Sequence, residues 1–192
     1  MTRSQFFRYA GWSAYVNAAA TILGFVTIIA FFIAGPPFGI INDASSVVIA
    51  LSTLPVLFTL YQLHRPAAPT ASLAAFVVGA IAMLVATVLQ TLLIVKVIAY
   101  AQTAATVPAM FGFFGASLLV YGCLTRAESL QPAGLAYLSI IAGAGYLMVM
   151  AGILLNGQEN PLAAIGGLMA VICYPIWAIW FGRLLLSGRL AL

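Results

Sequence analysis

The stretch "ASLAAFVVGAIAMLVATVLQTLLIVKVIAY", residues 71–100, holds a single charged residue and decides the fold class. About 20 apolar residues in a helix span the roughly 30 Å hydrocarbon core of a bilayer. Five further apolar stretches of comparable length occur along the chain. The predicted helices cover residues 11–34, 43–63, 71–100, 107–125, 133–156 and 161–187. We therefore expect an all-α membrane protein with six transmembrane helices in a single transmembrane domain, residues 1–192.

The composition agrees with this prediction. Of the 192 residues, 65% are hydrophobic and 5% are charged, a balance far more apolar than a soluble domain of this length requires. The segments between the predicted helices are short and carry glycine, proline and polar residues, which is typical of turns.

The basic residues predict how the chain is oriented. Six arginines fall before, between or after the predicted helices on one side of the membrane: Arg3, Arg8, Arg65, Arg126, Arg183 and Arg189. The other side has Asp43, Glu159 and Lys96. The positive-inside rule then places both termini in the cytoplasm. Because the arginines are spread over four segments, they form no basic patch of the kind that binds nucleic acid.

The chain also shows signs of an internal repeat. Related text begins the odd-numbered helices: "AGWSAYVNAAAT" at Ala10, "ASLAAFVVGAIA" at Ala71 and "AGLAYLSIIAGA" at Ala133. The even-numbered helices share one register at Pro55, Gly115 and Pro175. These spacings predict three tandem helical hairpins of about 61 residues, a parallel repeat. An alanine-rich composition can imitate such matches, so chance similarity stays open as the alternative.

Two sets of positions bear on how the helices pack. Small residues recur every four positions at Ala14 and Ala18, and again at Ala71, Ala75 and Gly79, which predicts close helix contacts. The three positions Pro55, Gly115 and Pro175 predict helix kinks at matching depth. The kinks either shape the bundle or form a ring whose freed carbonyls line a cavity.

Lys96 interrupts the longest apolar run. It lies 25 residues after Ala71, about 38 Å along a helix, which exceeds the hydrocarbon thickness. We therefore expect Lys96 at the outer rim as an interfacial anchor. The alternative is an ion pair with Asp43 or Glu159 at the mouth of a cavity. Asp43, in "INDASS", is also predicted to cap the start of the second helix, and Glu159 to mark the start of the last.

Two amides lie deeper in the predicted helices. Asn17 is about seven residues into the first helix and Gln90 about nineteen into the third. Each is expected either to hydrogen-bond a neighbouring helix or to contact a ligand. The candidate ligand-binding or cavity-lining residues are therefore Asn17, Asp43, Gln90, Lys96 and Glu159.

The remaining reactive side chains indicate no chemistry. The single histidine, His64, excludes a multi-histidine metal centre, and Cys123 and Cys173 lack CxxC spacing. The chain has no phosphate-binding glycine loop, no HExxH and no GxSxG, so an enzyme is not expected. The motifs imply no particular cofactor. The aromatic run "YPIWAIWFGR", residues 174–183, is interpreted as part of the interfacial belt common to membrane proteins.

The second half of the chain, "GASLLVYGCLTRAESLQPAGLAYLSIIAGAGYLM" and "YPIWAIWFGRLLL", resembles small bacterial six-helix membrane proteins of a family of unknown function. The resemblance covers mainly residues 112–187. It lies in an arginine-bearing turn followed by proline, here Arg126 and Pro132, and in a tryptophan-rich last helix that ends in a basic residue. In this chain those last residues are Trp177, Trp180 and Arg183. The resemblance implies a bacterial cytoplasmic membrane and no assigned activity.

Two functions are consistent with these features. The first is a non-catalytic membrane protein that binds a hydrophobic ligand or lipid, or serves as an accessory subunit of a larger membrane complex. The second is a small-solute transporter or its substrate-binding component, because six helices in 192 residues also resemble the membrane-embedded binding subunits of energy-coupling vitamin transporters. A third, an enzyme acting on lipid, lacks a reactive constellation. A polar cavity near Asn17, Gln90 and Lys96 would favour transport, whereas a dry core would exclude it.

Overall fold

The computed structural model describes residues 2–129, 131–157 and 159–190, and in these ranges it is helical, with no strand. The helices are α1 (Arg3–Ala34), α2 (Pro36–His64), α3 (Pro69–Ile94), α4 (Tyr100–Thr103), α5 (Thr106–Glu128), α6 (Ala133–Asn156) and α7 (Pro161–Leu186). Six spans are long and apolar enough to cross a membrane, with α4 and α5 counted together. This result confirms the all-α, six-span prediction.

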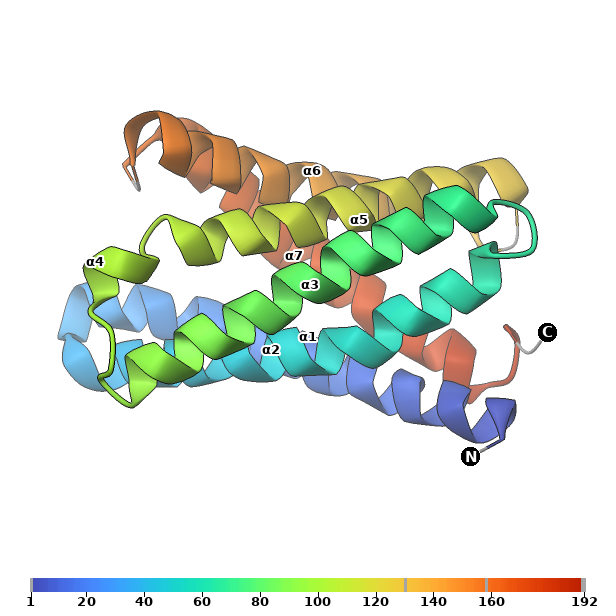
Figure 1. Ribbon diagram of the computed structural model, residues 1–192, viewed down its shortest axis with the longest axis horizontal. Coiled ribbons are helices and arrows are strands. Elements are labelled where there is room, and N and C mark those ends of the chain that lie inside the picture. Colours follow the sequence, from blue (N-terminus) through green and yellow to red (C-terminus); the bar gives the residue numbers. More distant parts are fainter. Residues whose placement is uncertain (1, 130, 158, 191–192) are drawn as a thin grey trace.

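The long helices form a closed ring that follows the order of the chain (Figure 1). Each packs against its sequence neighbour, and α7 returns to pack against α1. Both termini lie at one end of the bundle, whereas α4 lies at the opposite end (Figure 1). We call these the terminal end and the α4 end. The connections that contain Arg65 and Glu159 consequently lie at opposite ends.

The first helix starts eight residues earlier than the apolar pattern predicted, at Arg3 instead of residue 11. Thr2 and Gln5 form a capping box. The Thr2 backbone N–H donates to Gln5 Oε1 over 2.8 Å, and the Gln5 backbone N–H donates to Thr2 Oγ1 over 3.4 Å. This pairing satisfies two backbone donors at the helix start, so the helix begins in polar sequence before the apolar run.

The second helix also begins early, and this corrects the prediction for Asp43. The segment "GPPFGIIND" was expected to be a turn, but Gly35, with φ of 88°, makes the whole turn and α2 begins at Pro36. Proline suits the first helical positions because its φ is fixed and its missing N–H would have no partner there. Asp43 therefore does not cap the helix. It lies seven residues inside α2, about 10 Å from its start.

The third helix ends at Ile94, six residues before the predicted end at Tyr100, so Lys96 is not helical. Lys96 has φ of 60°, and its N–H donates to Leu93 O over 3.0 Å, while Val97 N–H donates to Leu92 O over 2.9 Å. These two bonds form a Schellman motif with Lys96 at the left-handed position, which usually holds glycine. Nothing in the apolar sequence marks this stop.

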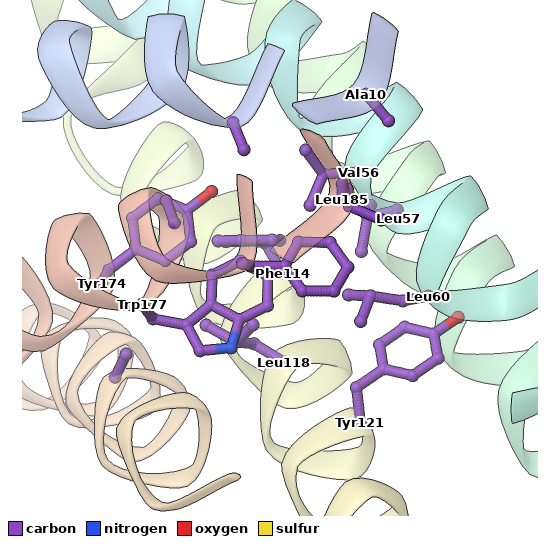
Figure 2. Close-up of a cluster of buried hydrophobic side chains, with 14 of the residues drawn as sticks. Ala10, Val56, Leu57, Leu60, Phe114, Leu118, Tyr121, Tyr174, Trp177 and Leu185 are labelled. Atoms are coloured by element: carbon purple, nitrogen blue, oxygen red, sulfur yellow. The ribbon is translucent and has the colours of Figure 1, made fainter. Parts of the chain in front are cut away.

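The centre of the bundle contains an aromatic stack on α7 (Figure 2). Trp177 lies between Tyr174, at a centroid distance of 5.8 Å, and Phe181, at 5.1 Å, and all three are buried. Phe114 of α5 meets Tyr174 edge to face at 5.4 Å. Tyr174, Trp177 and Phe181 belong to the run, residues 174–183, that was interpreted as part of an interfacial belt. That interpretation is wrong for the three α7 rings, because one face of α7 points into the bundle.

Glycines let the helix backbones approach one another. A Cβ added at Gly115 of α5 would lie 2.5 Å from the Tyr146 Cβ and 2.8 Å from the Gly143 carbonyl oxygen of α6. Gly166 of α7 similarly faces the Gly145 carbonyl of α6 at 2.5 Å. The predicted small-residue contacts are also present: Ala14, Ala18, Ala75 and Gly79 are buried, although Ala71 is exposed.

The Gly115 contact predicts a position-dependent effect of a methyl group. Gly115→Ala should lower stability by about 1–3 kcal/mol, because the Cβ overpacks against a backbone carbonyl. Gly167→Ala is the control, since the nearest atom to its Cβ lies 4.0 Å away, and should raise stability by up to about 1 kcal/mol. Thermal unfolding in maltoside micelles measures both variants. Equal effects would contradict the packing described here.

The Schellman motif predicts that Lys96→Gly stabilises the protein. A non-glycine residue in the left-handed region carries a strain of roughly 1–2 kcal/mol, which glycine would remove. Lys96→Ala is the matched control because it removes the side chain but keeps the strain. A rise in melting temperature for glycine and not for alanine is the expected outcome. A fall for both would show instead that the lysine side chain stabilises the turn.

Candidate functional site

A cavity of about 320 Å³ lies within the α4 end of the helix ring. Residues from all six long helices and from α4 line it, including Gly24, Asp43, Gln90, Tyr100, Phe111, Tyr146 and Gly167. Gln90 lies four residues before the end of α3 and Gly167 six residues after the start of α7, about 6 Å and 9 Å along those helices. The volume falls within the range of small-molecule binding sites.

Most polar groups in the wall bond to the backbone of their own or a neighbouring helix. Asn42 Nδ2 donates to Gly24 O over 2.9 Å and so links α2 to α1. Thr21 Oγ1 donates to Asn17 O over 2.9 Å, and Ser46 Oγ donates to Asn42 O over 3.1 Å. Thr103 Oγ1 donates to Tyr100 O over 3.0 Å. These bonds use one donor of each side chain, and the hydroxyl oxygens and Asn42 Oδ1 can still accept a hydrogen bond.

Gln90 and Asp43, also in the wall, form none of these bonds to the backbone. Gln90 is 6% exposed, and its Oε1 is buried with no hydrogen-bond partner among the residues described. Asp43 is partly exposed, and its carboxylate forms no hydrogen bond or ion pair with any residue in the described ranges. Buried polar groups are nearly always paired, so an orphaned amide oxygen beside a cavity indicates a place for water or a ligand.

The rest of the wall is apolar and aromatic. Phe111 and Tyr146 stack with centroids 6.0 Å apart and planes 25° apart, and Phe25 and Tyr100 add two further rings. No lysine or arginine belongs to the described lining, and Asp43 carries its one formal charge. The cavity is thus a largely apolar site with one carboxylate, Asp43, and two amides, Asn42 and Gln90.

The other predicted site residues lie elsewhere. Asn17 is fully buried and donates to Ile49 O, Ser52 Oγ and Thr53 Oγ1 over 2.8, 3.0 and 2.8 Å, so it joins α1 to α2. Lys96 and Glu159 are exposed and do not line the cavity. Within the described residues, neither forms an ion pair with the other or with Asp43. The alternative considered for Lys96, an ion pair at a cavity mouth, is therefore not formed among the described residues.

The three predicted kink positions do not line the cavity. Pro55, Gly115 and Pro175 all lie inside uninterrupted helices. Pro55 O accepts from Thr59 Oγ1 over 2.9 Å, and Gly115 packs against α6. Pro175 has no N–H to donate, so the carbonyl of Val171, four residues earlier in α7, lacks its helical donor. Val171 does belong to the cavity wall. The ring of kinks is therefore not what forms the cavity.

No protein-family model, curated protein or solved structure matches this chain. The resemblance of residues 112–187 to a bacterial family of unknown function stays a prediction.

The terminal end contains a second polar cluster, which the sequence did not predict. His64, at the end of α2, is fully buried, and its Nδ1 lies 2.8 Å from Glu128 Oε2 of α5. Its Nε2 lies 3.2 Å from Thr125 Oγ1. Tyr121 packs beside the imidazole at 5.8 Å and donates its hydroxyl to Ser72 O over 2.8 Å. The cluster ties α2, α3 and α5 together.

Sequence reasoning missed these residues for identifiable reasons. His64 was considered only as a metal ligand, and Glu128 was assigned no role because "RAES" resembles an ordinary polar turn.

One feature of the sequence could have indicated the position of Asp43 in the cavity. Had the prolines at residues 36 and 37 been interpreted as a helix start, Asp43 would have lain inside a membrane span, where an ionisable group indicates function.

The buried contact predicts energetic coupling between His64 and Glu128. His64→Leu and Glu128→Leu should each lower stability by about 1–3 kcal/mol, because each leaves a buried polar partner unpaired. The double variant should lose less than the sum of the two, with a coupling of about 0.5–3 kcal/mol. Thermal unfolding of all four proteins in micelles tests this. Glu159→Gln, an exposed carboxylate, is the neutral control, and strictly additive losses would contradict the pairing.

Proposed function

We propose that this protein is a non-catalytic, multi-pass membrane protein that binds a hydrophobic small molecule or lipid between its helices. The observation that supports this proposal most directly is the cavity of about 320 Å³, with its largely apolar wall. The proposal includes no reaction, because the sequence lacks the usual hydrolytic, metal-binding and nucleotide-binding motifs. A role as an accessory subunit of a larger membrane complex is compatible with such binding.

A small-solute transporter, or its membrane-embedded binding component, is the second candidate. The orphaned amide of Gln90 and the unpaired carboxylate of Asp43 meet in one cavity, and this favours recognition of a polar group. Uptake of a bound compound into proteoliposomes would distinguish this candidate from a binding protein, which would show saturable binding without accumulation.

The proposal also covers the orientation of the protein and its internal repeat. We infer that the terminal end, with its six arginines, faces the cytoplasm of a bacterial cell membrane. We also infer that the hairpins α1–α2, α3–α5 and α6–α7 are tandem repeats. The closure of the ring between α7 and α1 supports a repeated arrangement, because equivalent hairpins would meet through equivalent faces. Cysteine labelling from either side of the membrane tests the orientation.

The ligand itself can be sought directly. The full chain would be extracted into native lipid discs and analysed by mass spectrometry, which detects small molecules and protein partners together. We expect a small molecule in stoichiometric amount. A bare chain with no bound molecule and no partner would contradict the proposal.

A cavity-filling variant connects that ligand to this cavity. Gly167→Leu should remove the bound molecule, because its side chain enters open space in the cavity without meeting the neighbouring backbone. Ala164→Leu is the matched control, since Ala164 is exposed on the same helix and outside the cavity wall. We expect at least a tenfold loss of bound ligand for Gly167→Leu and none for Ala164→Leu. Equal retention by both would place the ligand elsewhere.

A further inference from the structure

The charge of the cavity wall points to the class of ligand. Among the described lining residues, Asp43 carries the one formal charge, and no basic side chain accompanies it. Lys96, the single lysine of the sequence, is exposed and forms no ion pair with it. An anionic ligand would meet the Asp43 carboxylate with no compensating cation. An unpaired carboxylate beside an apolar wall is costly, so a ligand that carries a positive charge would be favoured.

The aromatic rings favour the same charge. Phe25, Tyr100, Phe111 and Tyr146 all belong to the wall. Aromatic faces attract organic ammonium groups through the negative face of the ring, and aromatic cages are a recurrent way to bind them. Gln90 also belongs to the wall, and its buried Oε1 has no hydrogen-bond partner among the described residues.

The wall does not suit a bare metal ion. Calcium takes six to eight oxygen ligands, and zinc takes nitrogen or sulfur ligands in a tetrahedron. In the ranges 2–129, 131–157 and 159–190, no three His, Cys, Asp or Glu side chains gather closely enough to hold a metal. A volume of about 320 Å³ also far exceeds that of a single ion.

We propose, building on the ligand-binding function above, that the cavity recognises a soluble organic cation with an apolar body. The Asp43 carboxylate pairs with the cationic group, the aromatic rings attract the same group, and the apolar side chains of the wall enclose the apolar part. A zwitterionic lipid headgroup also carries an ammonium, but its phosphate would lie close to Asp43 with no lysine or arginine in the described wall to bind it. The unpaired charge of the wall therefore favours a free cation over a lipid.

A pair of isosteric probes tests the proposal. Benzyltrimethylammonium and neopentylbenzene have the same shape and differ in the positive charge. Binding of each probe to the purified full chain would be measured in maltoside micelles, whose headgroups are uncharged. The two probes would be compared at equal probe concentration within the micelle, so that a difference in their partition into detergent does not enter the comparison. We expect the cation to bind at least tenfold more tightly than the neutral isostere. Equal or tighter binding of neopentylbenzene would overturn the proposal.

Substitution of the carboxylate identifies the counter-charge. Asp43→Asn should weaken benzyltrimethylammonium binding at least tenfold and leave neopentylbenzene binding unchanged. Glu159→Gln is the matched control, because it removes a negative charge from the same end of the bundle outside the cavity wall. If the two variants weakened binding equally, the attraction would be a general surface effect and the proposal would fail.

Two further outcomes distinguish the possible failures. If neopentylbenzene bound and Gly167→Leu abolished that binding, while the cation did not bind, ligand binding would stand and cation recognition would fall. If neither probe bound and no molecule accompanied the chain in native discs, both proposals would fall together. Displacement of benzyltrimethylammonium by an equal concentration of short-chain phosphatidylethanolamine would overturn the preference for a free cation and assign the cavity to a lipid headgroup.

Discussion

Close approach of helix backbones is the constraint on which the whole structure depends. Lipid tails are as apolar as leucine, so burial of apolar surface does not drive transmembrane helices together, and contact must come from tight packing. Glycine provides that packing here. Gly115 and Gly143 join α5 to α6, and Gly145 and Gly166 join α6 to α7. Gly11 and Gly182 then close the ring between α1 and α7, where a Cβ on Gly182 would lie 2.9 Å from Gly11 O.

The same constraint explains why the cavity lies where it does. Gly166 and Gly167 are adjacent on α7, yet Gly166 meets the backbone of α6, while Gly167 lines the cavity and a Cβ there would come no closer than 4.0 Å to Val149 Cγ2. Towards the terminal end, the buried aromatic stack of Tyr174, Trp177 and Phe181 fills the interior, and Figure 2 labels Tyr174 and Trp177 of this stack. Towards the α4 end the interior has no equivalent filling, and a cavity remains. The bundle is therefore packed at one end and hollow at the other.

The polar groups are divided less sharply between the two ends. At the terminal end the side chains of His64, Thr125 and Tyr121 have partners and one Glu128 oxygen is bonded to His64. Glu128 Oε1 and Gln131 Nε2, at the same end, have no partner among the described residues. In the cavity, Asp43 and the Gln90 oxygen have none among the residues described. Paired groups stabilise a fold, whereas unpaired groups in the wall of a cavity are available to a ligand. The cavity, and not the unpaired groups alone, is therefore the reason for proposing a binding site at the α4 end.

Several features were accessible from the sequence by itself. Apolar runs of about 20 residues require helices in lipid, because the backbone must satisfy its own hydrogen bonds there. The six spans followed directly, and residues 133–156 were predicted with the bounds that α6 has. Helix ends depend on local capping by Thr2, Pro36 and the left-handed Lys96, which hydropathy does not report. These ends were therefore misplaced, and with them the depth of Asp43.

The sequence also contained Asp43 and Gln90 as candidates, but only the tertiary structure separated them from Asn17, Lys96 and Glu159. A polar side chain's role depends on whether a neighbouring helix supplies its partner. Ile49 and Thr53 of α2 do so for Asn17, whereas no described neighbour does so for the Gln90 oxygen. Composition and periodicity determined that six helices would form. Which side chains would face a common cavity was decided by the close contacts that fix each helix's rotation about its axis.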